Sequence, residues 1–530
     1  MKILLIVPTH GYQDYPTVLS ASDFPTGLAY IASALKEAGH EVIGLNLNNI
    51  RGYGTGLAMI TNEIERTIMA RNPDMIATGG ICTDFHFLRD AINVIRKCTD
   101  KPIVLGGGIV TNDHEYIINL LKPDYAIVGE GEEVIVQLAN NHYNVSDIKN
   151  IGYWEDGKAV FNTIDYHYGD INLRPLPDYD VFNISEMIDK YSYNTRLLYR
   201  YSRLDPRPMV IVTARGCPYS CSFCVHDNNR HYRARSIDSI MSEIKQNYEK
   251  YKFNILIIVD ELFAVDKKRM KDFCNALLVG KEAYGWDFDW MFQTHANAKL
   301  DKEALELAKK AGCYLFSYGL ESASPTVLKS MNKHMNISQI IEAIELSKQV
   351  GIGFSGNLIM GDPAETPETI QETLEFYFKH CKYSFVFLAF MMPYPGSRVF
   401  DYCVSHGMIK DKVAYYEHIG NMSANMTRMP NEEWIAWSQL FSKLERSWLY
   451  VEDTDVEKHE YLGNGWQNLY TTCPHCGEKL LYRERVGNDL DNASPLHFLG
   501  TGCLKCNQKI RVNFKPRNKT KVKAKELVEV

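Results

Sequence analysis

Two stretches of this 530-residue chain alternate between short apolar runs and amphipathic segments. In the first stretch, helical patterns such as Gly27–Ala38 and Phe87–Cys98 separate apolar runs of strand length. Strands that alternate with helices form a parallel sheet with helices on both faces. The pattern therefore predicts an α/β, Rossmann-like domain with strands at Lys2–Pro8, Glu41–Asn46, Met75–Thr78, Ile103–Leu105 and Tyr125–Val128.

The alternation resumes at Met209 with a different spacing and contains six more strand candidates. Because a complete TIM barrel has eight βα units, six units predict a partial (β/α)6 barrel. The functional residues of such barrels lie at the carboxyl ends of the strands. The predicted strands are Met209–Ala214, Ile255–Asp260, Asp289–Thr294, Tyr314–Gly319, Phe354–Met360 and Phe385–Met391.

Changes in pattern divide the chain into six expected segments. A proline-bearing linker separates the two α/β units, and a helical segment with the amphipathic run Asn431–Tyr450 follows the barrel. The segments are the Rossmann-like domain at 1–145, the linker at 146–205, the barrel at 206–400, the helical segment at 401–465, a four-cysteine unit at 466–515 and a basic tail at 516–530.

The charge balance limits the partners. Lys+Arg 58 against Asp+Glu 65 gives a net charge of −7, and a net-acidic chain is not suited to coat nucleic acid or an anionic membrane. The sequence contains no apolar run of about 20 residues, the length that spans a bilayer. We therefore expect a cytoplasmic protein that binds neither membrane nor nucleic acid.

Glycine-rich turns follow three strands of the first domain: Gly79-Gly80, Gly106-Gly107-Gly108 and Gly129-Glu130-Gly131-Glu132. One such turn alone is explained by tight helix–strand geometry. Three turns on one predicted edge favour a large flat or nucleotide-like ligand, because glycine lets backbone approach a ligand closely. No G-x-G-x-x-G opens the first helix, so a dinucleotide is not supported.

Three cysteines, Cys217, Cys221 and Cys224, follow the first barrel strand with the spacing C-x3-C-x2-C. Three thiolates on one loop can hold three irons of a cubane cluster and leave the fourth iron open to an external ligand. The alternative is a zinc site or three buried thiols. Zinc prefers four ligands in a closed site, and the nearest fourth candidate, His226, does not complete the set.

This motif, with Phe223 as its aromatic residue, resembles that of the radical S-adenosylmethionine (SAM) superfamily. Other segments resemble the cobalamin (B12)-binding branch of that superfamily, and together they cover roughly residues 1–400. They are Pro25–Tyr30, Ala38–Val42, Gly106–Gly108, Val128–Glu132, Asp260–Phe263, Gly319–Ser322, Gly361–Pro363 and Pro393–Ser397.

The resemblance implies three cofactors. Cys217, Cys221 and Cys224 would bind a 4Fe-4S cluster, and Phe223, Glu261, Glu321 and Ser322 would contact SAM. Cobalamin would bind base-off at Gly106, Gly107, Gly108, Gly129 and Glu130, since no D-x-H-x-x-G supplies the histidine that ligates cobalt in other cobalamin proteins. A residue of the loop Ile81–His86 would approach the lower face of cobalamin.

The implied activity is that of a C-methyltransferase. Such enzymes use an adenosyl radical to activate an unreactive carbon, which then captures a methyl group that SAM has delivered through methylcobalamin. They require an external electron donor. Two alternatives remain open: a non-methylating member such as a ring-forming cyclase, and a non-catalytic cobalamin or redox sensor.

A second cysteine cluster consists of two C-x2-C knuckles: Cys473, Cys476, Cys503 and Cys506. Four thiolates at this spacing form a tetrahedral site for zinc or a single iron. A small metal ribbon followed by a basic tail favours a protein or peptide substrate, with the ribbon placed beyond the barrel mouth. The chain also resembles methanogen enzymes that C-methylate side chains of methyl-coenzyme M reductase, glutamine among them.

Overall fold

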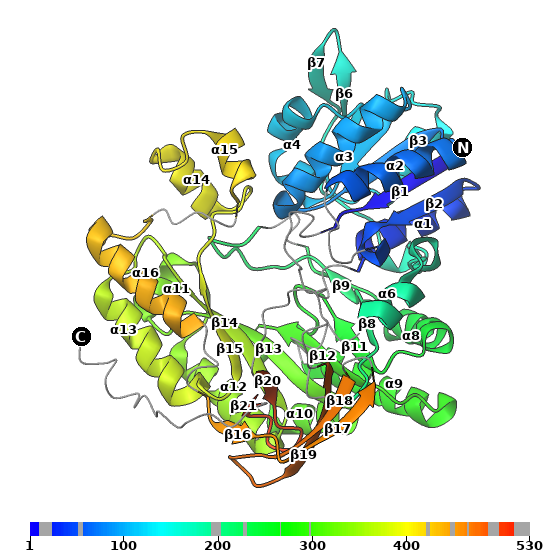
Figure 1. The fold of residues 1–530 in the computed structure, drawn as a ribbon. Coiled ribbons are helices and arrows are strands. Elements are labelled where there is room, and N and C mark those ends of the chain that lie inside the picture. Colours follow the sequence, from blue (N-terminus) through cyan, green and yellow to red (C-terminus); the bar gives the residue numbers. More distant parts are fainter. Residues whose placement is uncertain are drawn as a thin grey trace.

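The structure is a computed structural model. It describes residues 1–9, 24–50, 57–191, 203–225, 231–265, 267–295, 298–419, 425–445, 451–463, 466–485 and 498–513. A first α/β domain, a barrel and a small C-terminal β unit follow one another along the chain (Figure 1).

The first domain is built on a seven-stranded sheet in the order β2-β1-β3-β4-β5-β6-β7. Its first five strands run parallel, as predicted. Alternate residues of the first strand enter different cores: Leu5 packs on one face of the sheet, and Leu4 and Ile6 pack on the other. These strands are β1 (Lys2–Val7), β2 (Glu41–Asn46), β3 (Met75–Gly79), β4 (Ile103–Gly106) and β5 (Tyr125–Ile127).

Helices connect these strands and cover both faces of the sheet (Figure 1). The helices therefore bury both apolar faces of the sheet, as the sequence pattern indicated. The helices are α1 (Thr26–Glu37), α2 (Leu57–Arg71), α3 (Phe85–Cys98), α4 (Gly108–Leu121) and α5 (Glu132–Asn140).

The sheet continues into the segment predicted to be a linker. The strands β6 (Ile151–Glu155) and β7 (Lys158–Phe161) form an antiparallel hairpin that pairs with the edge of β5. Asp156 and Gly157 both have positive φ, 49° and 76°, which is the geometry of a two-residue type I′ hairpin turn. The Asp-Gly pair is the sequence signal for this hairpin.

The second domain is a six-stranded parallel sheet in the order β15-β14-β13-β12-β11-β8. Strand neighbours in space are also neighbours in sequence, so the sheet is the predicted partial barrel. Its strands are β8 (Pro208–Ile211), β11 (Ile255–Ile258), β12 (Asp289–Thr294), β13 (Cys313–Glu321), β14 (Gly353–Met360) and β15 (Phe385–Phe390).

Polar caps set where the barrel helices begin. Asp301, Asn336 and Thr366 each accept a hydrogen bond from a backbone N–H three residues ahead, and each such cap stabilises a helix by about 1 kcal/mol. The helices are α8 (Ile237–Tyr251), α9 (Lys267–Tyr284), α10 (Lys302–Lys310), α11 (Pro325–Ser330), α12 (Ile337–Val350) and α13 (Pro367–Phe376).

The helices after the barrel return toward both domains. In α15 (Lys412–Glu417), Lys412 pairs with Asp113 of α4 at 2.7 Å. The helix α16 (Asn431–Glu445) follows the start of the predicted run and packs against β15, with Trp434 buried over Phe390. The short α6 (Ile184–Tyr191) and α14 (Arg398–Ser405) complete the helical elements used below.

The four-cysteine unit begins earlier than predicted. Two of its strands, β16 (Asp453–Asp455) and β17 (Lys458–Gly463), come from the segment expected to be helical. They pair with β21 (Lys509–Asn513) and β18 (Trp466–Thr472), respectively. The remaining strands are β19 (Lys479–Arg485) and β20 (Phe498–Gly502). The predicted basic tail lies outside the described residues.

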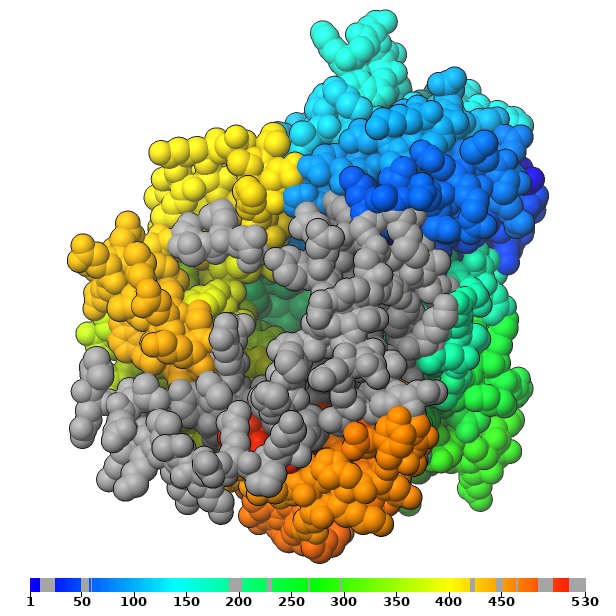
Figure 2. All heavy atoms as spheres, viewed as in Figure 1, coloured from blue at the N-terminus to red at the C-terminus, as the bar shows by residue number. Residues whose placement is uncertain are grey.

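The four-cysteine unit packs on the amino-terminal end of the barrel. The backbone N–H of Lys509 donates to Tyr383 O at 2.7 Å, just before β15. The Asn507 side-chain amide donates to Gly351 O at 2.9 Å, just before β14. Figure 2 shows the first domain in blue and this unit in orange on opposite sides of the molecule. The expectation that the unit stands beyond the barrel mouth is therefore wrong.

Ion pairs join the first domain to the barrel. Arg215, in the short strand β9 (Ala214–Arg215), pairs with Glu132 at 2.7 Å and with Glu130 at 3.2 Å. Arg233, in the adjacent β10 (Arg233–Ala234), pairs with Glu130. The Arg215 guanidinium also lies 4.7 Å from the ring centre of Tyr30 in α1. The glycine turn before α5 is thus tied to the strand before Cys217.

Glu132 is charged in this setting. Burial alone would raise the pKa of its carboxyl, but the charge of Arg215 outweighs burial and holds that pKa below its ordinary value of 4.5. Breaking a buried ion pair by removing one partner is costly because the other charge stays buried.

None of the described helices combines the length and the apolar character needed to cross a bilayer.

We predict that Glu132→Gln lowers the free energy of unfolding by about 3 kcal/mol, because Arg215 loses its nearest counter-charge. The matched control is Glu133→Gln on the same helix: the Glu133 side chain is 65% exposed, so its loss should cost less than about 1 kcal/mol. Urea unfolding of the two apo variants tests this. Because the pKa of Glu132 is lower in the folded protein than in the unfolded chain, the ionised carboxylate stabilises the fold above the unfolded pKa, and this stabilisation is lost as the pH falls through the folded pKa. The loss of stability caused by Glu132→Gln should therefore shrink as the pH falls below 4.5. Equal losses in the two variants would contradict the prediction.

Candidate cofactor site

A cavity of about 530 Å³ lies at the carboxyl ends of the strands of the first domain. All three predicted glycine turns line it, together with the first turn of α1. The barrel contributes Val212 and Arg215 to the same cavity, and Cys217 follows two residues later. The cavity of the first domain therefore opens onto the strand that leads into the cysteine loop.

The glycines of the cavity have different roles. Gly107 has a φ of +85°, and a Cβ there would lie 2.6 Å from Gly80 O, so this position needs glycine for the fold itself. A Cβ on Gly106 would meet nothing closer than 3.9 Å, so Gly106 leaves space open. A Cβ on Gly129, whose φ is +81°, would overlap the Tyr168 hydroxyl at 2.0 Å. A Cβ on Gly108 would lie 3.4 Å from the Ile81 side chain and 3.6 Å from that of Asn112, both ordinary contacts.

Glu130, predicted as a cobalamin contact, lines the cavity while its carboxylate pairs with Arg215 and Arg233. The structure thus shows an arginine partner for this carboxylate on the barrel side. The nucleotide-like ligand of the cavity would meet the backbone of this turn rather than an unpaired carboxylate.

Among the described residues that line the cavity, there is no histidine. The loop after β3 contributes Ile81, which is 52% exposed, and Asp84, whose carboxylate accepts a hydrogen bond from the Ile81 N–H at 2.8 Å. His86 turns away, because its Nε2 lies 2.7 Å from the carbonyl oxygen of Glu417 in α15. These side chains fit a cobalamin that takes no histidine ligand from this loop.

The three-cysteine loop is held by backbone contacts to two helices. The Ser222 N–H donates to Met331 O at 2.9 Å, and Ser222 O accepts from the Val399 N–H at 3.1 Å. The Asn332 side-chain amide donates to Ser220 O at 2.9 Å. Three anchors, from α14 and from the residues just after α11, therefore hold the loop in place.

The thiols of this loop are partly buried and near each other. Burial raises the pKa of Cys217 to about 11 and that of Cys224 to about 12, and the charge of Glu261 raises both further. Burial also raises the pKa of Cys221. The thiolate is the form that binds iron, so cluster binding would displace these protons. The donor set fits a cluster with three protein ligands.

Glu321, predicted to contact SAM, is paired with a lysine that the sequence analysis did not single out. The Lys333 Nζ lies 3.0 Å from Glu321 Oε1, and both side chains are buried. A Cβ on Gly319 would lie 2.4 Å from Glu321 Oε1 and 2.7 Å from Lys333 Nζ. The glycine of the Gly319–Ser322 segment therefore makes room for this ion pair.

Lys333 also faces the cysteine loop. Burial alone would lower the pKa of its ammonium group, but the charges of Glu321 and of the Cys221 and Cys224 sulfurs outweigh burial and raise it. Lys333 is thus a fixed positive charge between the Glu321 carboxylate and the cluster ligands. The only sequence signal for it is a lysine directly after a short helix at the carboxyl end of β13.

The other predicted SAM residues occupy different surroundings. Ser322 is buried, and its hydroxyl lies 3.2 Å from that of Thr373 in α13. Phe223 packs on an apolar cluster that includes Met331 and Val399. The exposed Glu261 lies near the cysteine thiols. Phe223 therefore anchors the cysteine loop itself, and Glu261 is the predicted SAM residue that lies near its thiols.

His295, directly after β12, is a further residue that contacts the cysteine loop. Its ring stacks on Tyr219 of the cysteine loop, with ring centres 4.1 Å apart. Burial lowers the pKa of His295 to about 3, so its imidazole is neutral at physiological pH. It supports the loop as an aromatic ring rather than as a cation.

The sequence matches two protein families. Residues 211–377 match the radical SAM superfamily, and residues 21–139 match the B12 binding domain. An uncharacterized methyltransferase from Pyrococcus horikoshii is 28% identical over 77% of this chain and 84% of that protein. The anaerobic magnesium-protoporphyrin IX monomethyl ester cyclase of Cereibacter sphaeroides is 25% identical over 70% of this chain and 59% of the cyclase.

Solved structures share the fold. The methyltransferase TsrM from Kitasatospora setae, with cobalamin and a [4Fe-4S] cluster bound, superposes with a TM-score of 0.61 at 16% identity over 76% of this chain and 78% of TsrM. The cobalamin-dependent enzyme OxsB gives a TM-score of 0.56 at 17% identity over 84% of this chain and 61% of OxsB.

This chain belongs to the radical SAM superfamily of enzymes. Like some members of that superfamily, it also carries a B12-binding domain. Its cofactors are SAM, a 4Fe-4S cluster and cobalamin. The four-cysteine unit lies outside both matched ranges.

We predict that Gly106→Leu blocks cobalamin uptake, because the new side chain would enter the open space of the cavity without striking the protein backbone. The matched control is Gly169→Leu, a position outside the cavity where a Cβ also meets nothing within 4 Å. Both purified variants are incubated with hydroxocobalamin, and the cobalt retained per chain is measured. Equal retention in the two variants would place the ligand elsewhere.

We predict that Lys333→Met weakens SAM binding by about 10-fold or more, because the buried Glu321 carboxylate then loses the ion-pair partner that holds it in place. Lys333→Arg, which keeps the charge, should retain part of the affinity. Lys329→Met, an exposed lysine on α11, is the control. SAM titration of the cluster-loaded proteins, followed by the EPR signal of the reduced cluster, gives the affinities. Unchanged affinity in Lys333→Met would refute the assigned role.

Proposed function

We propose that this enzyme is a C-methyltransferase that moves a methyl group from SAM, with cobalamin as carrier, to an unactivated carbon. The observation that carries the proposal is the placement of the two sites. The cavity of the B12-binding domain is completed by Val212 and Arg215, and the cluster loop begins two residues later. A substrate carbon between the two sites would be reached from both.

The residues of the chain position and isolate the reactants. When bound, the cluster supplies the electron that cleaves SAM, and cobalamin carries the methyl group. Cys217, Cys221 and Cys224 hold the cluster on a loop that Met331 and Val399 fix in place. Glu321, held by its ion pair with Lys333, is suited to accept hydrogen bonds from the amino group of SAM. Buried charges of this kind act strongly because little water surrounds them.

A ring-forming reaction is the second candidate, and the similarity to the cyclase of Cereibacter sphaeroides supports it. The methyltransferase proposal is favoured by the Pyrococcus horikoshii relative, which matches more of both chains. A sensor without catalysis is disfavoured because the cysteine loop, its anchors and Lys333 are arranged as a cluster and ligand site.

We propose a protein side chain as the methyl acceptor, with a glutamine of methyl-coenzyme M reductase as the first to test. The resemblance of the sequence to methanogen enzymes of that kind supports this choice. The ribbon does not add to it, because the ribbon lies at the amino-terminal end of the barrel, away from the site.

SAM carrying a deuterated methyl group tests the reaction. We expect the wild-type enzyme to form 5′-deoxyadenosine and to place a labelled methyl group on the acceptor peptide. Changing Cys217, Cys221 and Cys224 together to Ala should abolish both products, whereas Cys98→Ser, a half-buried cysteine on α3, should leave them intact.

Each outcome separates the candidates. SAM cleavage without label in any product would support the cyclase reading and overturn methyl transfer. Absence of SAM cleavage in the loaded wild-type enzyme would support the sensor. Deoxyadenosine formation by the triple variant would overturn the cluster assignment itself. Comparison of peptide masses from the methanogen reductase with and without the enzyme then tests the acceptor.

A further inference from the structure

We propose that Cys473, Cys476, Cys503 and Cys506 bind one zinc ion that locks the C-terminal ribbon over the amino-terminal end of the barrel, remote from the radical chemistry. The proposal does not depend on which reaction the enzyme performs. It concerns a part of the chain that neither family match covers.

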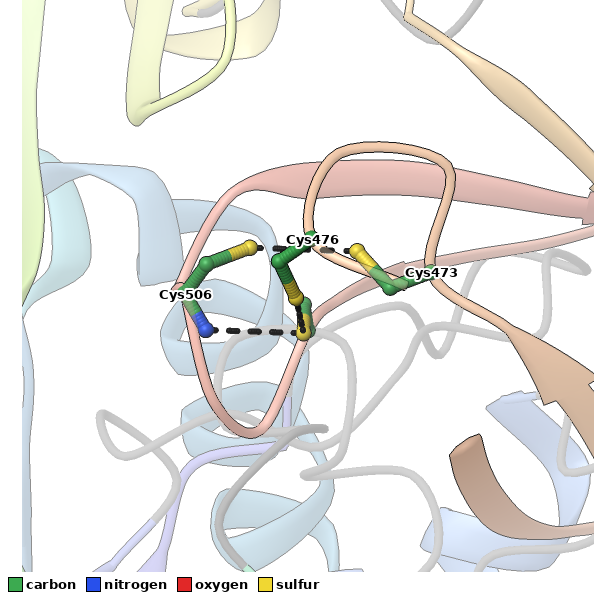
Figure 3. A group of neighbouring side chains, drawn as sticks. Cys473, Cys476 and Cys506 are labelled. Atoms are coloured by element: carbon green, nitrogen blue, oxygen red, sulfur yellow. Dashed lines mark hydrogen bonds between the residues drawn. The ribbon is translucent and has the colours of Figure 1, made fainter. Parts of the chain in front are cut away.

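The four sulfurs are arranged as the corners of a tetrahedron. The Sγ atoms of Cys473 and Cys506 lie 3.8 Å apart, and those of Cys476 and Cys503 lie 3.7 Å apart. All four ligand atoms lie within 4.8 Å of one another, and Figure 3 shows the two turns that bring them together. Four sulfurs at the usual Zn–S distance of about 2.3 Å are separated by about 3.8 Å along each edge of the tetrahedron.

The two C-x2-C turns have the same backbone geometry. In the first, the Gly477 N–H donates to Cys473 O at 3.0 Å; in the second, the Asn507 N–H donates to Cys503 O at 3.0 Å. The first cysteine of each turn also donates its N–H to the carbonyl oxygen of the residue five positions later: Cys473 to Glu478 O at 2.8 Å, and Cys503 to Gln508 O at 3.0 Å. Gly477 and Asn507 both have positive φ. The repetition indicates two halves of one metal site.

Backbone N–H groups are aimed at a sulfur as well. The Lys505 N–H lies 3.4 Å and the Cys506 N–H 3.5 Å from Cys503 Sγ. Donors of this kind favour the thiolate over the thiol, and the thiolate is the form that binds metal.

The ribbon has little else to hold it together. Among the residues that the structure describes in this unit, its apolar core contains, besides Cys473 and Cys503, six buried side chains: Leu469, Leu480, Tyr482, Leu499, Ile510 and Val512. Units with so small a core usually need a metal or disulfides to fold. Because all four thiols of the site can be metal ligands and none is in a disulfide, a metal is the available cross-link.

The location of the site argues for a structural ion. His475 packs on Tyr383 with ring centres 4.7 Å apart, and Asn507 donates to Gly351 O, so the ribbon contacts the residues just before β15 and β14. The eight residues of β14 separate this end from the site, a span of about 26 Å. Four thiolates leave zinc no open position for a substrate or a redox partner.

The test measures metals in the full-length enzyme with its 4Fe-4S cluster reconstituted. We expect one zinc per chain in the wild type and in the control Cys98→Ser, and none in Cys476→Ser. The cluster EPR signal and SAM cleavage should persist in Cys476→Ser, while its thermal unfolding temperature falls. The loss of zinc should be specific, with the cluster iron content unchanged.

A second measurement tests the zinc site even if Cys476→Ser fails to fold. A mercurial reagent is added to the wild type and to Cys98→Ser, and released zinc is detected with a chromogenic chelator; one zinc per chain is expected from each. One non-cluster iron in place of zinc would overturn the zinc assignment. Zinc retained by folded Cys476→Ser would overturn the ligand set. Loss of the cluster signal in a folded Cys476→Ser would overturn the structural role.

Discussion

The charge contacts across the domain boundary are the interaction on which the rest of this enzyme depends. Arg215 and Arg233 of the barrel hold Glu130 and Glu132 of the B12-binding domain. These acids belong to a glycine turn that lines the cavity, and Arg215 precedes the first cluster cysteine by two residues. A chemistry that uses two cofactors on one carbon needs them at a set separation, and buried, paired charges supply a stiff connection.

A second buried pair, Lys333 with Glu321, serves the cluster end of the site. The two pairs differ in purpose. The domain pairs fix backbone elements relative to each other, whereas Lys333 pairs with a buried carboxylate near the cysteine loop. In both places a carboxylate that would be unstable alone in the interior is stabilised by a cation from a different element of the fold.

The cofactor sites and the C-terminal ribbon lie at opposite ends of the barrel strands. The cysteine loop and the cavity lie at the carboxyl ends of the strands, and the ribbon lies at their amino ends (Figures 1 and 2). In barrels of this kind the carboxyl end carries activity and the amino end carries stability. A metal ribbon at the amino end is therefore placed to reinforce the barrel without entering the reaction, and a protein substrate would have to be recognised elsewhere.

The sequence by itself determined the five parallel strands of the first sheet, the partial barrel and the two cysteine groups, because periodicity and spacing are local properties. It also contained the hairpin turn at Asp156-Gly157, although the surrounding segment lacked a long pattern. Only the tertiary structure decided that Glu130 meets Arg233, that Lys333 meets Glu321, and that the ribbon closes the amino-terminal end of the barrel. These contacts join residues from different elements, and which charges become buried together depends on how those elements pack rather than on any pattern along the chain.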